Sequence, residues 1–595
     1  MQFNKLAKVF NKLENTTKRL VMLEILVELF KEAPTTVLKK VVYLTSGKIS
    51  PDYEDVDFGI AEKMVVKAIA KAMGTTEKKI DKSYRRLGDL GSVAEEQMQN
   101  VGQKSIDSFF PGGKEKQTKI TVTELWEKLH KIAKTEGKGA INKKIKYLLG
   151  LYSQTSPIES KYLTRIILSQ LRLGVKDLSI IEALSQAFSD RPDAREIIEH
   201  AYNIRCDIGE VAEVLAKKGL MKVANMSVQV GRPIRMMAAQ RMNSIEEILE
   251  KLGGKCALEY KYDGERVQAH ITNNQVKLFS RNLNDISNMY PDICKELIKA
   301  INSNDIIIEG EITAWDTEKN NLKPFQTLMI RKRKYGIEKA IKNVPVKVFL
   351  FDVLYKNGQS LLSNTYQQRR EILKNSIISK NHLIEIAKCS IVSTPNEFEN
   401  VFQKAINYGC EGVMAKELRD SSIYQAGNRG FLWIKHKFDY TSTFADSYDF
   451  VVVGGFYGKG RRKGTLGTLL MAAYNPIKNV YETVCKLGSG FSDENLQQIT
   501  NELEKLKANE KPKDVSAKIE PDIWIYPDKV YEVQGADLST SPVHTCALDE
   551  IQADSGIAIR FPRFIRFRED KNPEQITTSD EIINAYKKQR LMNKQ

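Results

Sequence analysis

The segment Leu258-Glu259-Tyr260-Lys261-Tyr262-Asp263-Gly264-Glu265-Arg266 carries the pattern on which the interpretation of this chain depends. Side chains alternate along a β-strand, so Glu259 and Lys261 are expected on one face of a strand. Asp263-Gly264 has the composition of a tight turn, after which Arg266 begins a return strand. A lysine on a strand becomes a nucleophile when burial or neighbouring cations lower its pKa. A hairpin with an exposed lysine would show the same residues, so the rest of the sequence must decide.

Further segments supply carboxylates and cations on strands. Ile308-Glu309-Gly310-Glu311-Ile312 places two carboxylates on one face of an apolar strand, which is costly unless they meet a metal or cations. Spacing does not decide which of the two approaches a metal. Trp433-Ile434-Lys435-His436-Lys437 puts two lysines on one face, where they suit a polyphosphate and depress the pKa of a third lysine. The other segments of this kind are Ser280-Arg281-Asn282, Phe351-Asp352-Val353-Leu354, Glu411-Gly412-Val413-Met414-Ala415-Lys416 and Gly427-Asn428-Arg429-Gly430.

The two charged residues of the Glu411–Lys416 segment are not placed by spacing alone. Simple alternation puts Glu411 and Lys416 on opposite faces of a strand, because Lys416 is five positions after Glu411. A bulge or a strand end between them would change that. Lys416 is therefore left outside the predicted site.

Apolar periodicity divides the chain into three regions. Through residues 1–228, apolar residues recur at three- and four-residue spacing, which predicts helices. Short strands alternate with helices over 229–440, which predicts an α+β domain. Residues 441–595 contain glycine-rich turns between five expected strands, and a β-barrel of the OB-fold type is the first choice there. The expected fold is a multidomain chain with an all-α, an α+β and a β-barrel domain. The five strands are expected at 450–457, 468–474, 481–487, 523–533 and 557–567.

Length and composition exclude several classes of protein. A chain of 595 residues is too long for a single hydrophobic core. The formal net charge of +16 favours a polyanionic partner, and the excess lies outside residues 441–595, which are close to neutral. The seven cysteines form no C-x-x-C pair, so neither a zinc ribbon nor a disulfide framework is indicated. A signal peptide and long uncharged apolar runs are lacking, so we expect a soluble protein of the cytoplasm or nucleoid with no membrane partner.

Taken in order, these motifs resemble those of the covalent nucleotidyltransferases, which include ATP-dependent DNA ligases, RNA ligases and mRNA capping enzymes. The run Arg560-Phe561-Pro562-Arg563-Phe564-Ile565-Arg566-Phe567-Arg568-Glu569-Asp570-Lys571 is similar to the last motif of that superfamily, in its DNA ligase form. Leu171-Arg172-Leu173-Gly174-Val175 resembles the helical DNA-binding domain of archaeal and eukaryotic replicative ligases. The resemblance to ATP-dependent DNA ligases of that type extends over the whole chain.

The resemblance implies a reaction in three steps. Lys261 attacks the α-phosphate of ATP and forms a lysyl–AMP phosphoramidate, the AMP passes to the 5′-phosphate of a nick, and the 3′-hydroxyl then displaces it. It also implies a monomer that encircles nicked duplex DNA and uses Mg²⁺ or another divalent cation. Glu311 and Glu411 are the implied metal-facing carboxylates. The implied nucleotide-binding residues are Glu259, Arg266, Arg281, Glu311, Phe351, Arg429, Lys435 and Lys437, and those that orient diphosphate are Arg560, Arg568, Asp570 and Lys571.

A short segment within the helical region points to a protein partner. Gln103-Lys104-Ser105-Ile106-Asp107-Ser108-Phe109-Phe110 resembles the peptide by which replication proteins dock on the sliding clamp. A helical turn would place Ile106, Phe109 and Phe110 on one side as a hydrophobic plug, with Gln103 preceding them. Alternatively, these apolar residues belong to the core of the helical domain. Polar residues on both sides favour an exposed loop.

Other interpretations stay open at this point. Two basic runs, residues 331–334 and 459–463, are candidates for DNA-backbone contacts, but they would also suit a solvated surface. An RNA ligase or a GTP-using capping enzyme is disfavoured by the large helical region and by the Arg560–Lys571 run. The absence of a four-cysteine zinc cluster disfavours an NAD-dependent ligase. A non-catalytic DNA-binding scaffold is disfavoured by the presence of Lys261, Glu311, Glu411 and Lys435.

Overall fold

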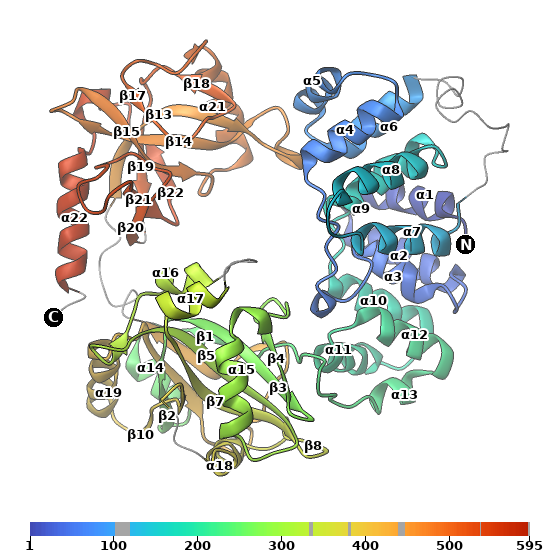
Figure 1. The fold of residues 1–595 in the computed structure, drawn as a ribbon, viewed down its shortest axis with the longest axis vertical. Helices are drawn as coiled ribbons and strands as arrows, with labels where there is room; N and C mark the ends of the chain where they lie inside the picture. The colour runs from blue at the N-terminus through green and yellow to red at the C-terminus, as the bar shows by residue number, and fades with distance from the viewer. Residues whose placement is uncertain (101–119, 332–336, 379–381, 438–446, 536, 593–595) are drawn as a thin grey trace. The chain divides into compact units, whose positions relative to one another are not determined.

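The computed structural model describes residues 1–100, 120–331, 337–378, 382–437, 447–535 and 537–592 (Figure 1). The chain forms two compact units, one made of residues 1–80 and 90–438, the other of residues 81–89 and 439–595. The predicted clamp-docking residues Gln103, Ile106, Phe109 and Phe110 lie outside the described residues, as do residues 332–334 of the first basic run.

The described part of residues 1–224 consists of helices and their connections, apart from the isolated bridge between Gln2 and Thr121. Helix α9 is at the centre of this region, since all residues from Glu159 to Ile167 are buried. It begins with a capping box in which Ser156 and Glu159 satisfy each other's backbone N–H groups. The helices are α1 Phe3–Glu14, α2 Arg19–Glu32, α3 Leu38–Thr45, α4 Glu62–Ala72, α5 Glu77–Leu87, α6 Leu90–Asn100, α7 Val122–Ala133, α8 Ala140–Tyr152, α9 Pro157–Ile167, α10 Asp177–Phe188, α11 Ala194–Arg205, α12 Ile208–Lys218 and α13 Leu220–Ala224.

Two β-sheets follow in the same unit. The first has the strand order β1-β12-β11-β2-β10, and the second has the order β4-β3-β5-β7-β8, with β6 paired to β5 and β9 to β7. The strands of the first sheet are β1 Ala238–Arg241, β2 Cys256–Lys261, β10 Cys389–Val392, β11 Gly412–Glu417 and β12 Arg429–Lys437. Those of the second are β3 Glu265–Thr272, β4 Gln275–Ser280, β5 Asp305–Asp316, β6 Asn321–Leu322, β7 Val346–Lys356, β8 Gln359–Ser360 and β9 Ile384–Ile386.

Helices cover these sheets and complete their cores. Helix α19 packs on β2 and β11 through Phe398 and Phe402, while α15 packs on β4 through Ile293 and Leu297. Arg331, the first residue of the basic run at 331–334, is buried and forms an ion pair with the carboxylate of Asp292. The prediction that Arg331 faces DNA is therefore wrong. The helices are α14 Ile245–Lys251, α15 Pro291–Ala300, α16 Phe325–Leu328, α17 Ile337–Asn343, α18 Tyr366–Ser376 and α19 Pro395–Asn407.

The expected hairpin at Asp263-Gly264 is wrong. Strand β2 pairs with β10 and β11, whereas β3 pairs with β4 and β5, so the turn carries the chain from the first sheet to the second. A Cβ atom on Gly264 would collide with the carbonyl oxygen of Ile312 on β5. Glycine is therefore required here by the close approach of the two sheets. Lys261 ends the strand that precedes this crossing.

The second unit is built mainly of strands. Its larger sheet contains β13 to β19 and β22, and β20 pairs with β21. Two of the five expected strands are each divided by a turn: 523–533 into β18 and β19, and 557–567 into β21 and β22 at Phe561-Pro562, where Phe561 has a φ of 53° and is 73% exposed. The elements are β13 Ser447–Tyr457, β14 Leu466–Asn475, β15 Val480–Leu487, α21 Asp493–Glu504, β16 Lys507–Ala508, β17 Val515–Ser516, β18 Ile523–Ile525, β19 Val530–Gln534, β20 Asp537–Ser541, β21 Gly556–Arg560, β22 Arg563–Phe567 and α22 Ser579–Met592.

Helix length and hydropathy were compared with what a bilayer requires. None of the helices in the described ranges is both long enough and apolar enough to span a membrane.

Candidate active site

Lys261 lies at the end of β2, where it pairs with one carboxylate and is influenced by the charge of another on β5. Its Nζ atom is 2.5 Å from Oε2 of Glu411, and Nζ of Lys437 is 2.7 Å from the same oxygen. Burial lowers the pKa of Lys261, but the negative charges of Glu411 and Glu311 outweigh it, so that the net shift is upward. Without a bound nucleotide, Lys261 is therefore held as an ammonium ion.

A glycine explains how Glu411 and Lys416 both meet β2. Gly412 begins β11 with a φ of 152°, and a Cβ atom there would collide with the carbonyl oxygen of His436. Glu411 precedes the strand and turns toward Lys261, whereas Lys416 within the strand pairs with Glu259 at 2.7 Å. Glu259 and Lys261 share a face of β2, so alternation is interrupted at Gly412. Lys416, which the sequence prediction omitted, is thus part of the site.

Asp263 and Glu311 add two more carboxyl groups around Lys261. Burial, together with a hydrogen bond and charge repulsion from Glu411, raises the pKa of Asp263 to about 7. Burial also raises the pKa of Glu311 to about 7, although Lys261 and Arg266 oppose the shift. Glu411 stays ionised with a pKa of about 2, because the contributions of Lys261 and Lys437 and a hydrogen bond from Asp263 exceed the cost of burial. A cation or phosphate that binds beside Lys261 would therefore change the protonation of Asp263 and Glu311.

Glu309 has a different environment from Glu311. It is fully buried and accepts hydrogen bonds from Arg266 at 2.8 Å, from Tyr424 at 3.0 Å and from Gln268 at 3.3 Å. Arg266 also donates to the carbonyl oxygen of Met237 at 2.7 Å. These bonds occupy both oxygens of Glu309, so Glu311 is the carboxylate of this strand that remains beside Lys261. The hydrogen bonds of Glu309 favour Glu311 as the carboxylate available to a cation.

Glu259 forms the centre of a second polar cluster. Its Oε1 accepts hydrogen bonds from the Tyr366 hydroxyl at 2.5 Å and from Arg370 at 2.6 Å, while Oε2 pairs with Lys416. The Lys416 ammonium also lies 5.0 Å from the centre of the Phe351 ring. The predicted Glu259 and Phe351 are thus brought together, and Tyr366, Arg370 and Lys416 join them. Only Lys416 had a recognisable signal, its position in the motif with Glu411.

An internal ion pair fixes the strand that carries Phe351. Asp352 and Arg369 are both fully buried, and the guanidinium binds the two carboxylate oxygens at 2.8 and 3.1 Å. Arg369 also donates to the carbonyl oxygens of Asn364 and Ser422. Since Arg369 belongs to α18, this pair holds that helix, with Tyr366 and Arg370, against β7.

Several cations, Lys261 among them, lie near enough to Lys435 to influence its charge. Burial lowers the pKa of Lys435, and the charges of Lys437, Lys261, Arg429 and Arg281 lower it further. In the part of the chain that the structure describes, the side chain of Lys435 has no hydrogen-bond or ion-pair partner. A group of cations with an unpaired member is suited to a polyphosphate.

The predicted diphosphate-orienting residues belong to the second unit and are held by carboxylates there. Arg568 binds Asp449 and Asp570, and Lys571 binds Asp449. Arg560 lies 3.8 Å from Asp537. The contacts of these residues are thus described within the second unit alone.

The carboxylates near Lys261 do not form a complete protein metal site. No group of three or more His, Cys, Asp or Glu side chains within the described ranges is arranged to hold a metal ion. Glu311 and Glu411 are nevertheless hard oxygen donors, and Mg²⁺ commonly takes one or two carboxylates and completes its shell with water and substrate phosphates. The donor set fits a metal that arrives with a nucleotide.

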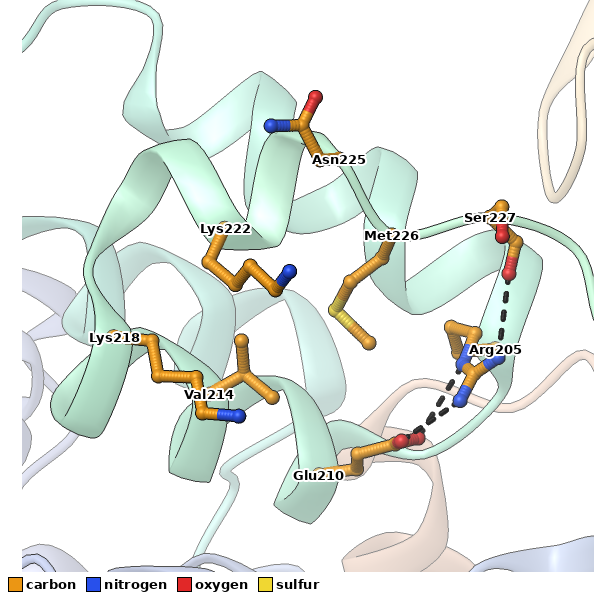
Figure 2. Close-up of a pocket in the computed structure, with 8 residues that line it drawn as sticks. All are labelled: Arg205, Glu210, Val214, Lys218, Lys222, Asn225, Met226 and Ser227. Atoms are coloured by element: carbon orange, nitrogen blue, oxygen red, sulfur yellow. Dashed lines mark hydrogen bonds and ion pairs between the residues drawn. The ribbon is translucent and has the colours of Figure 1, made fainter.

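A pocket of about 210 Å³ lies apart from these residues, among α11, α12 and the segment around α13 (Figure 2). One wall is the ion pair of Arg205 with Glu210, at 2.8 Å, and Arg205 also donates to the backbone oxygen of Ser227. Lys218 and Lys222 contribute two ammonium groups that have no ion-pair partner among the described residues. Its lining is completed by Val214, Asn225 and Met226.

A lysine where the chain crosses between two sheets, beside carboxylates and a group of cations, is the arrangement expected of a nucleotidyl-transfer protein. Three family models match the chain. They are the ATP dependent DNA ligase domain over residues 236–437, the DNA ligase N terminus over 2–185 and the ATP dependent DNA ligase C terminal region over 462–571.

Curated relatives match over nearly the full length. DNA ligase 2 of Thermofilum pendens is 44% identical over 99% of this chain and 98% of its own. The DNA ligase of Staphylothermus marinus is 45% identical over 99% of both chains, and that of Sulfolobus acidocaldarius 43% over 98% of both. Two solved structures titled Pmar-Lig_PreS3 and Pmar-Lig_Pre share the fold, with TM-scores of 0.53 and 0.55 at 17% and 16% identity, over 95% of this chain and 99% of theirs. The chain belongs to the ATP-dependent DNA ligases and is of the archaeal type.

Proposed function

We propose that this DNA ligase seals nicks between a 5′-phosphate and a 3′-hydroxyl in duplex DNA, with Lys261 as the residue that carries AMP. The observation that supports this most strongly is the position of Lys261, between the carboxylates of Glu411 and Glu311 and a group of cations. In the first step Lys261 Nζ bonds to the α-phosphorus of ATP and diphosphate leaves. In the next two steps the AMP passes to the DNA 5′-phosphate and is released when the 3′-hydroxyl attacks.

The proton on Lys261 must leave before the lysine can attack. In the nucleotide-free site, Glu411 and Glu311 stabilise the ammonium form. Lys437 shares Oε2 of Glu411 with Lys261, and the charges of Lys435 and Lys261 act on each other, so both lysines favour the neutral amine of Lys261 once the carboxylates engage another cation. Glu311 and Glu411 are the residues proposed to hold Mg²⁺ or a similar divalent cation, which when bound supplies positive charge to the phosphates.

The other site residues are proposed to hold the nucleotide. Phe351 offers a ring face for adenine, beside Lys416. Glu259 would accept from the adenine amino group at Oε2, which it shares with Lys416. Arg266 is fixed in direction by Glu309 and Met237 and is assigned to the ribose and α-phosphate side. The residues proposed to bind the phosphates are Arg281, Arg429, Lys435 and Lys437.

The finer architecture is part of the same proposal. We assign residues 1–228 to an all-α DNA-binding domain, 229–440 to the adenylation domain and 441–595 to an OB-fold domain. The chain would act as a monomer that encircles DNA, within the cell in the cytoplasm or nucleoid, during replication, repair and recombination. The ammonium groups of Lys218 and Lys222, which have no ion-pair partner in the described ranges, support DNA-backbone contacts at this pocket of the helical region (Figure 2).

The function is tested by following label from α-labelled ATP. We expect the label to enter the protein, to move to the 5′ end of a nicked DNA duplex, and to appear as free AMP when the nick is sealed. GTP in place of ATP should give no labelled protein, and a nick between two RNA strands should be sealed more slowly than one in DNA. Labelling by GTP, or preference for RNA, would favour an RNA ligase or capping enzyme instead.

Clamp docking by Gln103–Phe110 is proposed from the sequence motif. The double change Phe109→Ala and Phe110→Ala should abolish binding to the sliding clamp, because it removes the two largest apolar contacts of the plug. Pull-down with purified clamp measures the binding, and sealing without the clamp should be unchanged. Loss of self-labelling with AMP in this variant would show that the two aromatic residues belong to a core.

A further inference from the structure

Asp449 connects the two cations of the last motif. It is on β13, and its side chain is only 12% exposed. Both of its oxygens lie 2.9 Å from NH1 of Arg568, and Oδ2 also lies 2.6 Å from Nζ of Lys571. A nearly buried carboxylate thus holds two positive groups that would repel each other without it.

The backbone around Asp449 fixes the position of its carboxylate. Its N–H donates to the Thr577 hydroxyl at 3.0 Å, and the Thr577 N–H donates to the carbonyl oxygen of Asp449 at 3.0 Å. In the sheet, Asp449 is the register partner of Glu532 on β19, and Glu532 is the register partner of Arg566 on β22. Three neighbouring strands therefore determine the position of Asp449 (Figure 1). The carboxylate is therefore part of a rigid sheet rather than of a loop.

Two carboxylates bind Arg568, and they differ in exposure. Asp570 receives Nε and NH2 at 2.8 and 2.7 Å, but its side chain is 66% exposed and only two residues away in the chain. Asp449 is distant in sequence and nearly buried. Lys571 uses one of its three N–H donors on Asp449, which leaves the others for an anion. The direction of both cations is thus determined mainly by Asp449.

We propose that Asp449 is a positioning residue for lysine adenylylation, which holds Arg568 and Lys571 in the arrangement that receives the diphosphate portion of ATP. This rests on the proposed function and on the diphosphate-orienting role that the family resemblance implies for these two cations. Asp449 is proposed to act through the two cations that it binds. Its effect is confined to the step in which diphosphate leaves, because the later steps transfer AMP without diphosphate.

The test compares two steps in the full-length chain. Asp449→Ala should lower kcat/KM for uptake of AMP from ATP by roughly 10- to 100-fold, the usual effect of losing a charged hydrogen bond. Inhibition of that step by added diphosphate should weaken in the same variant. The second measurement is the rate at which the variant, without ATP, seals a nick that already carries AMP on its 5′-phosphate. This rate should change less than about twofold. Asp528→Ala, which removes an exposed carboxylate of the same unit, is the control and should match the wild type.

Other results would overturn the proposal. Unchanged AMP uptake by a folded Asp449→Ala protein would show that Asp449 positions nothing, and equal losses in both steps with a lower Tm would show a purely structural role. If Asp449→Ala does not fold, Asp449→Asn provides the same comparison, since it keeps the shape but loses the charge. Failure of the wild type to take up AMP would instead refute the proposed function.

Discussion

Lys261→Ala should take up no measurable AMP from α-labelled ATP, a loss of more than about 10⁴-fold in rate. The Lys261 ammonium lies 2.5 Å from Glu411 and under the influence of Glu311, and alanine offers no atom to form the bond to phosphorus. The measurement is acid-labile, base-stable label retained on the denatured protein. The same variant should still seal a nick whose 5′-phosphate already carries AMP, because that step does not require the lysine to be adenylylated.

A matched control separates chemistry from folding. Lys255→Ala removes an exposed lysine just before the same strand and should label like the wild type. Equal labelling of Lys261→Ala and the wild type would show that another residue carries the AMP.

The second large effect concerns stability. Asp352→Ala should lower the free energy of unfolding of the unit that contains it by about 3–5 kcal/mol, because it leaves the Arg369 guanidinium buried without its carboxylate. The lost contact also releases α18 from β7, so Tyr366 and Arg370 should no longer be held beside Glu259. Circular dichroism in increasing denaturant measures the free energy of unfolding. The rate of limited proteolysis of the segment between the sheets measures the release of α18.

Two further variants show whether the charge itself is responsible. Glu371→Ala removes an exposed carboxylate of the same helix, 62% accessible and 3.6 Å from Lys374, and should cost less than about 1 kcal/mol. The double change Asp352→Leu and Arg369→Met should recover much of the stability, since no buried charge remains unpaired. A single Asp352→Ala variant as stable as Glu371→Ala would mean that water or another group replaces the carboxylate.

Strand alternation allowed much of the site to be predicted from the sequence. Glu259 with Lys261, and Lys435 with Lys437, were placed on shared faces, and the structure brings these pairs to the same region. Alternation works here because the strands are regular and short-range geometry determines where each side chain points. Strand positions at 305–315 and 346–355 were also close to β5 and β7 for this reason.

What could not be predicted depends on how strands combine. Lys416 was omitted because a φ of 152° at Gly412 cannot be recognised from the residue type alone. The pairing of β2 and β3 with different strands follows from contacts distant in sequence, and a turn between them looks the same as a hairpin turn. Likewise, Tyr366 and Arg370 meet Glu259 only because the buried Asp352–Arg369 pair positions α18. Burial of Arg331 depends on Asp292 in the same way.

The crossing of the chain at Gly264 has a practical consequence for anyone who prepares this protein. Lys261 and Glu411 come from one sheet, whereas Glu311 and Arg266 come from the other, so self-labelling requires both sheets to be intact and correctly joined. A molecule damaged in either sheet should not take up label. The moles of AMP bound per mole of chain should therefore count the correctly folded molecules in a preparation, independently of any DNA substrate.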